Sequence, residues 1–175
     1  MKDTRIEKLA KNLLHHSVEL KQDEKILIEI IGMDAVPLGK ELIKQAENMG
    51  SLPFFNIIDY EVMREMLLNA SEEQIKLYAK HDLQRMQDMD CYIGIRASTN
   101  TAELNGISKE KMEIYNKYYT LPVHLEERVK NTKWCILRYP NSSMAQMSNM
   151  NTEEFEDFYF NVCTLDYDKM SKAMD

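Results

Sequence analysis

Four short apolar runs, each separated from the next by a stretch with helical spacing, limit this chain to few folds. The runs are rich in β-branched and aromatic residues and occupy residues 26–31, 53–59, 90–96 and 134–139. A strand that is covered on both faces reads as a continuous apolar run, and parallel strands need a crossover helix between them. The alternation therefore predicts an α/β fold, with a mainly parallel open sheet of about four or more strands flanked by helices in three layers (α/β/α).

Capping residues predict where the helices begin and end. Asp34 is a suitable N-cap for the helix after the first run, and Gly50 is expected to close that helix in a left-handed conformation. Ser71 opens a capping box, and Ser108 is expected to cap a later helix. Pro122 is expected to interrupt that later helix, because proline lacks the N–H donor that a helix interior requires.

Length and charge limit the class of protein. The chain has 175 residues, which suits one domain, and a formal net charge of -7 with basic and acidic residues interleaved. Such a surface repels phosphate backbones, so we expect no nucleic-acid partner. The N-terminus lacks the apolar core of a signal peptide, and no apolar run approaches the length of a membrane span. We therefore expect a cytoplasmic protein without a membrane partner.

The cysteines and histidines give no motif for metal binding or nucleophilic catalysis. Cys91, Cys135 and Cys163 are widely spaced, and the first two lie in expected strands as small apolar side chains. The four histidines, His15, His16, His81 and His124, form no pair with metal-ligand spacing. We expect His81 to lie on the surface. His124 could face a cleft, but we expect it to have a capping or surface role. The glycines form no phosphate-binding loop. The residues therefore nominate no catalytic and no metal-binding side chain, and the substrate-binding residues stay unknown.

One architectural rule still indicates a place for a ligand. In open parallel sheets, ligands bind outside the carboxyl ends of the strands, which here are residues 32–34, 59–61, 96–100 and 139–146. Arg96 and Asn100 are the most useful polar groups among them. The alternative, which we favour, is that these side chains cap loops and helices or contact another domain, because position at a sheet edge is only an architectural argument.

The last third of the chain carries a signature. It consists of the strand KWCILRYP at residues 133–140, the turn SMAQ at 143–146, the helix TEEFEDFYFNVC at 152–163 and the exit LDY at 165–167. In this order and spacing, the four segments resemble the N-terminal half of the M29 family, the thermophilic-type metalloaminopeptidases. The resemblance spans nearly the whole chain, and Asn149 departs from it at a turn where a glycine is more usual.

The resemblance implies a metal-dependent exopeptidase that removes N-terminal residues from peptides. Two divalent ions, of the zinc or cobalt type, are held in this family by Glu, His and Asp of a C-terminal domain, and none of those ligands maps onto a position here. Residues 1–165 are thus expected to form the N-terminal domain, and 166–175 to begin the connection to an absent catalytic domain. The resemblance also implies a homodimer, with the chain's own catalytic domain and peptides as partners, and a fragment that is inactive and metal-free when alone.

A different class of function is also compatible with the residues. A stand-alone α/β module could bind a small ligand with its strand-end loops, and ligand contacts at Arg96 and Asn100 would favour this alternative. An exposed apolar face near Phe155, Phe158 and Tyr159 would instead favour a missing second domain. An α/β hydrolase or a nucleotide enzyme is disfavoured, because its motifs are absent.

Overall fold

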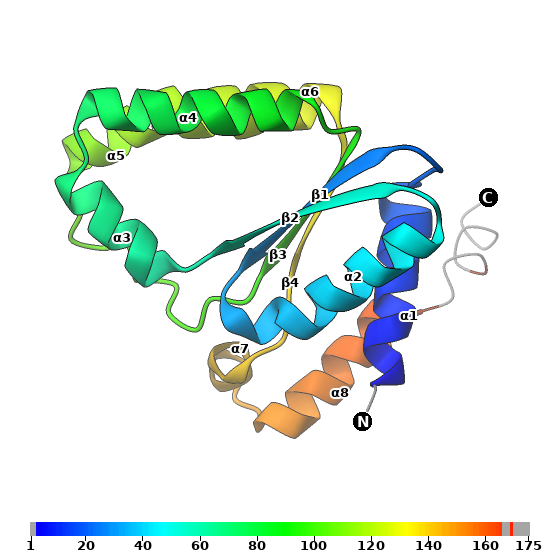
Figure 1. Cartoon of the computed structure of the whole chain (residues 1–175). Coiled ribbons are helices and arrows are strands. Elements are labelled where there is room, and N and C mark those ends of the chain that lie inside the picture. Colours follow the sequence, from blue (N-terminus) through cyan, green and yellow to red (C-terminus); the bar gives the residue numbers. More distant parts are fainter. Residues whose placement is uncertain (1–2, 166–168, 170–175) are drawn as a thin grey trace.

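A four-stranded sheet forms the centre of the computed structural model, which describes residues 3–165 and 169 (Figure 1). The strands are β1 (Lys25–Ile31), β2 (Leu52–Ile58), β3 (Cys91–Arg96) and β4 (Lys133–Arg138). They lie in the order β2-β1-β3-β4, and all three neighbouring pairs are parallel. The predicted parallel sheet is confirmed. The predicted connection at residues 166–175 lies outside the described residues, apart from Lys169.

Helices cover both faces of the sheet and complete the predicted three layers (Figure 1). On one side lie α1 (Thr4–Asn12), the π-helical turn η1 (Leu13–Ser17), α2 (Val36–Asn48), α7 (Ser142–Met147) and α8 (Thr152–Cys163). On the other lie α3 (Tyr60–Asn69), α4 (Glu72–Gln87), and the continuous helix made of α5 (Lys109–Tyr115), the π-helical η3 (Asn116–Arg128) and α6 (Val129–Asn131). A 3-10 turn, η2 (Met33–Ala35), leads into α2.

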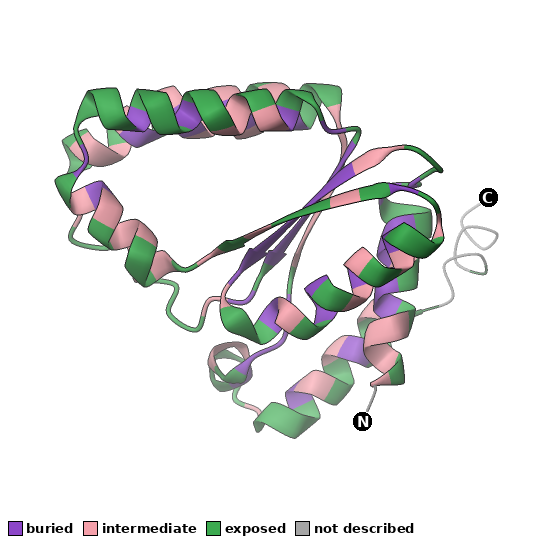
Figure 2. Ribbon diagram, in the orientation of Figure 1, coloured by how far each residue is buried: buried purple, intermediate pink, exposed green. Residues whose placement is uncertain are grey.

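Two separate cores result from the pleat of the strands. Ile26, Ile28 and Ile30 of β1 pack into the core below α1, α2 and α8, whereas Leu27 packs into the core below α4 and η3. The central strands are buried along almost their whole length (Figure 2). Among the described helices, none is both long and apolar enough to cross a membrane.

The edge strands β2 and β4 are less buried, and β2 is the more exposed of the two. It pairs only with β1, and its side chains Leu52, Phe54, Phe55 and Ile57 are between 43% and 60% exposed. Successive residues of a strand point to opposite faces, so β2 leaves apolar surface on both sides of the sheet.

Most of the predicted caps are confirmed. Gly50 follows α2 with φ 75°, and the hydroxyl oxygen of Ser71 accepts a hydrogen bond from the Gln74 backbone N–H at 3.1 Å. Ser108 caps α5 in the same way, accepting from the Lys111 backbone N–H at 3.3 Å.

Two predictions about helix boundaries are wrong. Asp34 does not cap α2: it lies inside the turn η2, and the N-cap position is taken by Ala35, which is fully buried. Because Ala35 packs into the core, α2 begins one residue later than expected, at Val36. Pro122 does not interrupt its helix, because it lies within η3. Each π-helical turn moves the acceptor of an N–H from the fourth to the fifth preceding residue, which relieves the clash of the proline ring with the carbonyl four residues earlier.

One carboxyl group lies inside the sheet. Glu29 of β1 is 5% exposed, and its Oε1 accepts a hydrogen bond of 2.8 Å from the hydroxyl of Tyr92 on β3. Burial raises the pKa of Glu29 above its ordinary value of 4.5, because the charged form loses its hydration. Burial therefore disfavours the charged form of Glu29 relative to the same group in the unfolded chain.

We predict that Glu29→Gln removes a pH-dependent loss of stability. With a raised native pKa, the native state keeps a proton that the unfolded state releases above about pH 4.5. The wild-type protein therefore loses up to about 1.4 kcal/mol per pH unit from this one proton as pH rises toward the native pKa. Urea unfolding between pH 4.5 and 8 should show a stability advantage of the variant that grows with pH. The exposed Glu47→Gln variant is the control; equal pH profiles for all three proteins would contradict the prediction.

Candidate functional site at the carboxyl edge of the sheet

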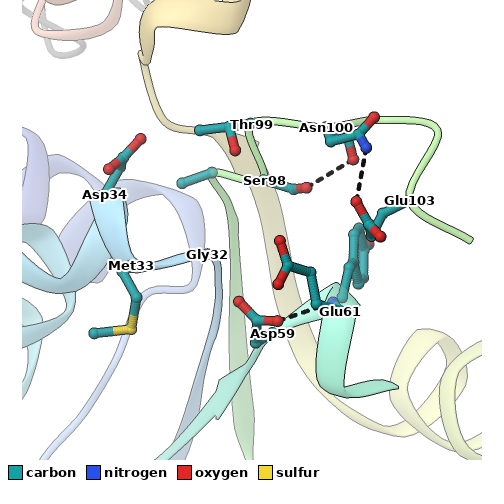
Figure 3. Close-up of a pocket in the computed structure, with 11 residues that line it drawn as sticks. Gly32, Met33, Asp34, Asp59, Glu61, Ser98, Thr99, Asn100 and Glu103 are labelled. Atoms are coloured by element: carbon teal, nitrogen blue, oxygen red, sulfur yellow. Dashed lines mark hydrogen bonds between the residues drawn. The ribbon is translucent and has the colours of Figure 1, made fainter. Parts of the chain in front are cut away.

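The loops that follow the strands meet at one edge of the sheet, as the parallel topology predicts. A cavity of about 200 Å³ lies between the ends of β1, β2 and β3, and a second of about 180 Å³ lies between the ends of β3 and β4. Asp34, Asp59, Ser98, Asn100 and Glu103 are among the residues that line the first cavity (Figure 3).

Gly32 sets how closely two of these loops approach. It has φ 90°, and a Cβ added there would lie 2.6 Å from the backbone oxygen of Ala97. Only glycine fits both the left-handed conformation and this contact. The end of β1 can therefore lie against the segment after β3, and this contact forms one wall of the first cavity.

The polar groups of the first cavity are used largely by its own loops. Oδ1 of Asp59 accepts from the backbone N–H groups of Glu61 at 2.8 Å and Val62 at 3.2 Å, which caps α3. Asn100 donates to Oε2 of Glu103 at 2.7 Å (Figure 3). It also accepts from the backbone N–H of Ala102 at 3.0 Å. These side chains have the loop and helix-capping roles that we favoured on the sequence.

Arg96 and Asn100 do not share a site. Asn100 lines the first cavity, whereas Arg96 lines the second, beside Arg138. The two arginines end β3 and β4 and are direct partners in the strand register. Sequence reasoning missed Arg138, although its position as the last residue of a parallel strand, like that of Arg96, was a usable signal.

Asn141 joins the loops of β3 and β4, and sequence reasoning missed it as well. It is 4% exposed, and its Nδ2 donates to the backbone oxygens of Ala97 at 3.0 Å and Ser98 at 3.3 Å. Its Oδ1 accepts from the Met144 backbone N–H at 3.0 Å, which caps α7. One amide side chain thus uses both its donor and its acceptor to fix the wall between the two cavities.

The two Asn caps of neighbouring helices provide a matched test of this role. We predict that Asn141→Asp lowers the free energy of unfolding at pH 7 by about 1–3 kcal/mol, because a carboxylate cannot donate to the Ala97 carbonyl. Asn151 caps α8 only through its Oδ1. Asn151→Asp should therefore change stability by less than about 0.5 kcal/mol. Equal losses in urea unfolding would show that the amide donor of Asn141 is dispensable.

The position of one histidine, His124, differs from the prediction. His15, His16 and His81 are exposed, as expected for His81. The capping or surface role predicted for His124 is wrong, because its ring packs edge-on against Tyr119, with centroids 5.5 Å apart, inside the helix-covered face. Pro122 leaves η3 unbroken, so His124 stays on its inner side. Burial lowers the pKa of His124 to about 4, and the ring is neutral at pH 7.

The three cysteines are free thiols. Cys91 is fully buried in β3, and burial raises its pKa to about 12, so the reactive thiolate is not formed near neutral pH. Cys135 is half-buried in β4, and burial raises its pKa as well. Both side chains behave as the small apolar groups predicted from their place in strands.

The described residues do not fit a metal centre. Within residues 3–165, no group of three or more His, Cys, Asp and Glu side chains lies close enough to hold an ion. Of the carboxylates at the first cavity, Asp59 caps α3 and Glu103 accepts from the side chain of Asn100. Between residues 3 and 165, the potential ligand side chains are therefore not grouped as a metal centre requires.

Comparison with known proteins gives a family and a fold. The family model for thermophilic metalloproteases (M29) matches residues 2–173. The structure is similar to wild-type AmpT from Thermus thermophilus, with a TM-score of 0.67 and 19% sequence identity. The matched region covers 92% of this chain and 43% of the AmpT chain, so this chain spans less than half of that protein's length. Among curated proteins, none matches the sequence significantly.

Proposed function

The chain belongs to the thermophilic metalloprotease family M29, and we propose that it is the N-terminal, non-catalytic domain of a metal-dependent aminopeptidase. Such a hydrolase removes N-terminal residues from peptides. In the proposal, residues 1–165 support the catalytic part and form one wall of its cleft or subunit interface. Residues 166–175 begin the connection to that catalytic part.

The proposal rests on one observation: the chain matches a metallopeptidase family, but its described residues do not supply the ligands of a metal ion. A metallopeptidase needs at least three protein ligands around a catalytic ion. The described residues contain no such group, although the family model matches nearly the whole chain. Because the chain corresponds to 43% of AmpT, the catalytic ligands belong in our proposal to the part of the protein that this chain does not span.

The surface of α8 supports a second domain, but through different residues from those expected. Of the predicted face, only Phe158 is exposed, because Phe155 is buried and Tyr159 is partly buried against the core below α1, α2 and α8. Phe158 instead begins a stripe that continues with Val162 and Leu165, each about half exposed. This stripe leads directly toward the proposed connection, and an uncovered apolar stripe of this kind is typical of a contact surface.

The other expectations for the parent protein are parts of the same proposal. Two divalent ions, of the zinc or cobalt type, would polarise the scissile carbonyl and activate water in the catalytic domain. Peptides would be the substrates and a homodimer the assembly. This domain would form part of the substrate cleft or of the contact surface between subunits.

The cavities at the sheet edge favour one alternative, a stand-alone module that binds a small ligand with its strand-end loops. Their position agrees with the general rule for open parallel sheets. Against it, Asn100 and Arg96 line different cavities, and Asn100, Asp59 and Asn141 are engaged by neighbouring backbone or side chains. The alternative therefore ranks second.

An activity assay tests the proposal directly. We predict that the purified 175-residue chain does not hydrolyse leucine p-nitroanilide with added Co²⁺ or Zn²⁺, because its described residues form no group that could hold an ion. Isothermal titration should likewise show no stoichiometric binding of either ion. An established metalloaminopeptidase in the same buffer verifies the assay. Turnover that requires the metal and disappears with a chelator would refute the proposal.

A further inference from the structure

The outer edge of β2 is apolar and uncharged along its whole length. The strand reads LPFFNII over residues 52–58, and no other strand of the described chain pairs with this edge (Figure 1). Soluble proteins usually protect such an edge with charged side chains or proline. Within residues 52–58, only Pro53 belongs to these classes. The edge is therefore suited to pairing with another strand.

The direction of the backbone groups shows what this edge offers to a partner. The backbone N–H of Leu52 donates at 2.8 Å to the residue just before β1, so Leu52 faces β1. Because backbone groups alternate in direction along a strand, those of Pro53, Phe55 and Ile57 point away from β1. Pro53 has no N–H, so the outer edge presents donors on Phe55 and Ile57 and an acceptor on all three residues.

Two copies of β2 complement each other when they pair antiparallel about Phe55. The two Phe55 residues then exchange both of their backbone hydrogen bonds, and each Ile57 N–H donates to the Pro53 oxygen of the other copy. At each end, Asp59 of one copy lies beside Ser51 of the other. No like charges face each other along the paired strands, although the protein has a net charge of -7.

Exposed side chains next to β2 enlarge the apolar surface. Val62 of α3 and Tyr78 of α4 lie beside Ile57 at a cavity of about 260 Å³, and they are 71% and 39% exposed. We define the β2 patch as Leu52, Phe54, Phe55, Ile57, Val62 and Tyr78.

The β2 patch is large enough for a reversible dimer. A half-exposed aromatic side chain contributes about 100 Å² of surface, so the six side chains contribute roughly 500 Å² in each copy. Two copies would bury about 1,000 Å² in total, which is the lower limit for a specific interface. We therefore expect a dimer that dissociates on dilution.

The apolar stripe assigned above to a second domain lies at the other edge of the sheet. That stripe is on α8, which contacts β4 through the Tyr159 hydroxyl, a donor to the Arg138 backbone oxygen. In the order β2-β1-β3-β4, the two edges are three strand spacings apart, or about 14 Å. A partner that covers the stripe from that side leaves β2 open, and the self-complementary edge favours a second copy of the chain.

We propose that β2 is a dimerisation surface, on which a second copy of this chain adds its own β2 in antiparallel orientation. The two four-stranded sheets then form one continuous sheet about a twofold axis through Phe55. The inference names the surface of the homodimer proposed above and rests on that part of the proposed function. Its readout is association, so its failure would leave the aminopeptidase proposal, which the activity assay tests, unaffected.

Light scattering after size exclusion measures the association. The wild-type chain should change from monomer to dimer as its concentration rises. Phe55→Lys should raise the dissociation constant at least about tenfold, because two ammonium groups would meet on the axis. Met147→Lys on α7 is the control, since Met147 is 61% exposed, against 60% for Phe55, and lies away from β2. Its dissociation constant should stay within about twofold of the wild-type value.

A cross-link tests the register of the pairing. Phe55→Cys places a thiol of each copy on the axis, with Cα atoms about 5.5 Å apart, a distance that a disulfide spans. Oxidation with copper phenanthroline should link this variant into covalent dimers on non-reducing gels. The wild type, with its buried and half-buried thiols, and Met147→Cys should stay largely unlinked.

Three outcomes would overturn the proposal. They are a wild-type chain that is monomeric at every concentration, a dimer that persists unchanged in Phe55→Lys, and cross-linking of Phe55→Cys that does not exceed that of Met147→Cys. If circular dichroism shows that Phe55→Lys does not fold, the wild-type association and the cross-link decide.

Discussion

Strand β1 is the element on which the rest of the structure depends. It is paired on both edges, with β2 and β3, and its side chains alternate between the two cores. A shift of one residue would exchange Leu27 and Ile28 between the cores and break both ladders at once, so its register is strongly determined. The close approach of Gly32 to Ala97 and the two cavities at the carboxyl edge follow from this fixed register.

Sequence reasoning succeeded where the determining interactions are local. The strand runs, Gly50 and the serine caps depend on residues a few positions apart, and the structure retains all of them. It failed where packing overrode a local rule. Burial of Ala35 displaced the cap expected at Asp34, and the π-helical geometry around Pro122 kept the helix continuous. The error at His124 followed from the second failure, because an unbroken helix points that ring inward.

The polar residues that shape the interior could not be found from spacing, because their partners are distant in sequence. Asn141 binds the backbone of Ala97, 44 residues away, and Glu29 accepts from Tyr92 of the neighbouring strand, 63 residues away. Arg128 looks like one more charged residue of a helix, and it is buried only because η3 crosses above β3 and β4. Such residues become recognisable once the topology has been established, whereas the family resemblance needed only the order of the segments.

The exposure of β2 has a consequence for how the chain is made. β1 and β2 emerge first from the ribosome, and every later strand of the described chain adds on the other side, next to β1 and then β3. β2 is therefore the outer edge of the sheet from the moment it pairs, with Phe54 and Phe55 half-uncovered on opposite faces. An unpaired apolar edge is a template for association with other chains. The nascent polypeptide thus exposes this apolar edge from its first third, and neither β3 nor β4 covers it.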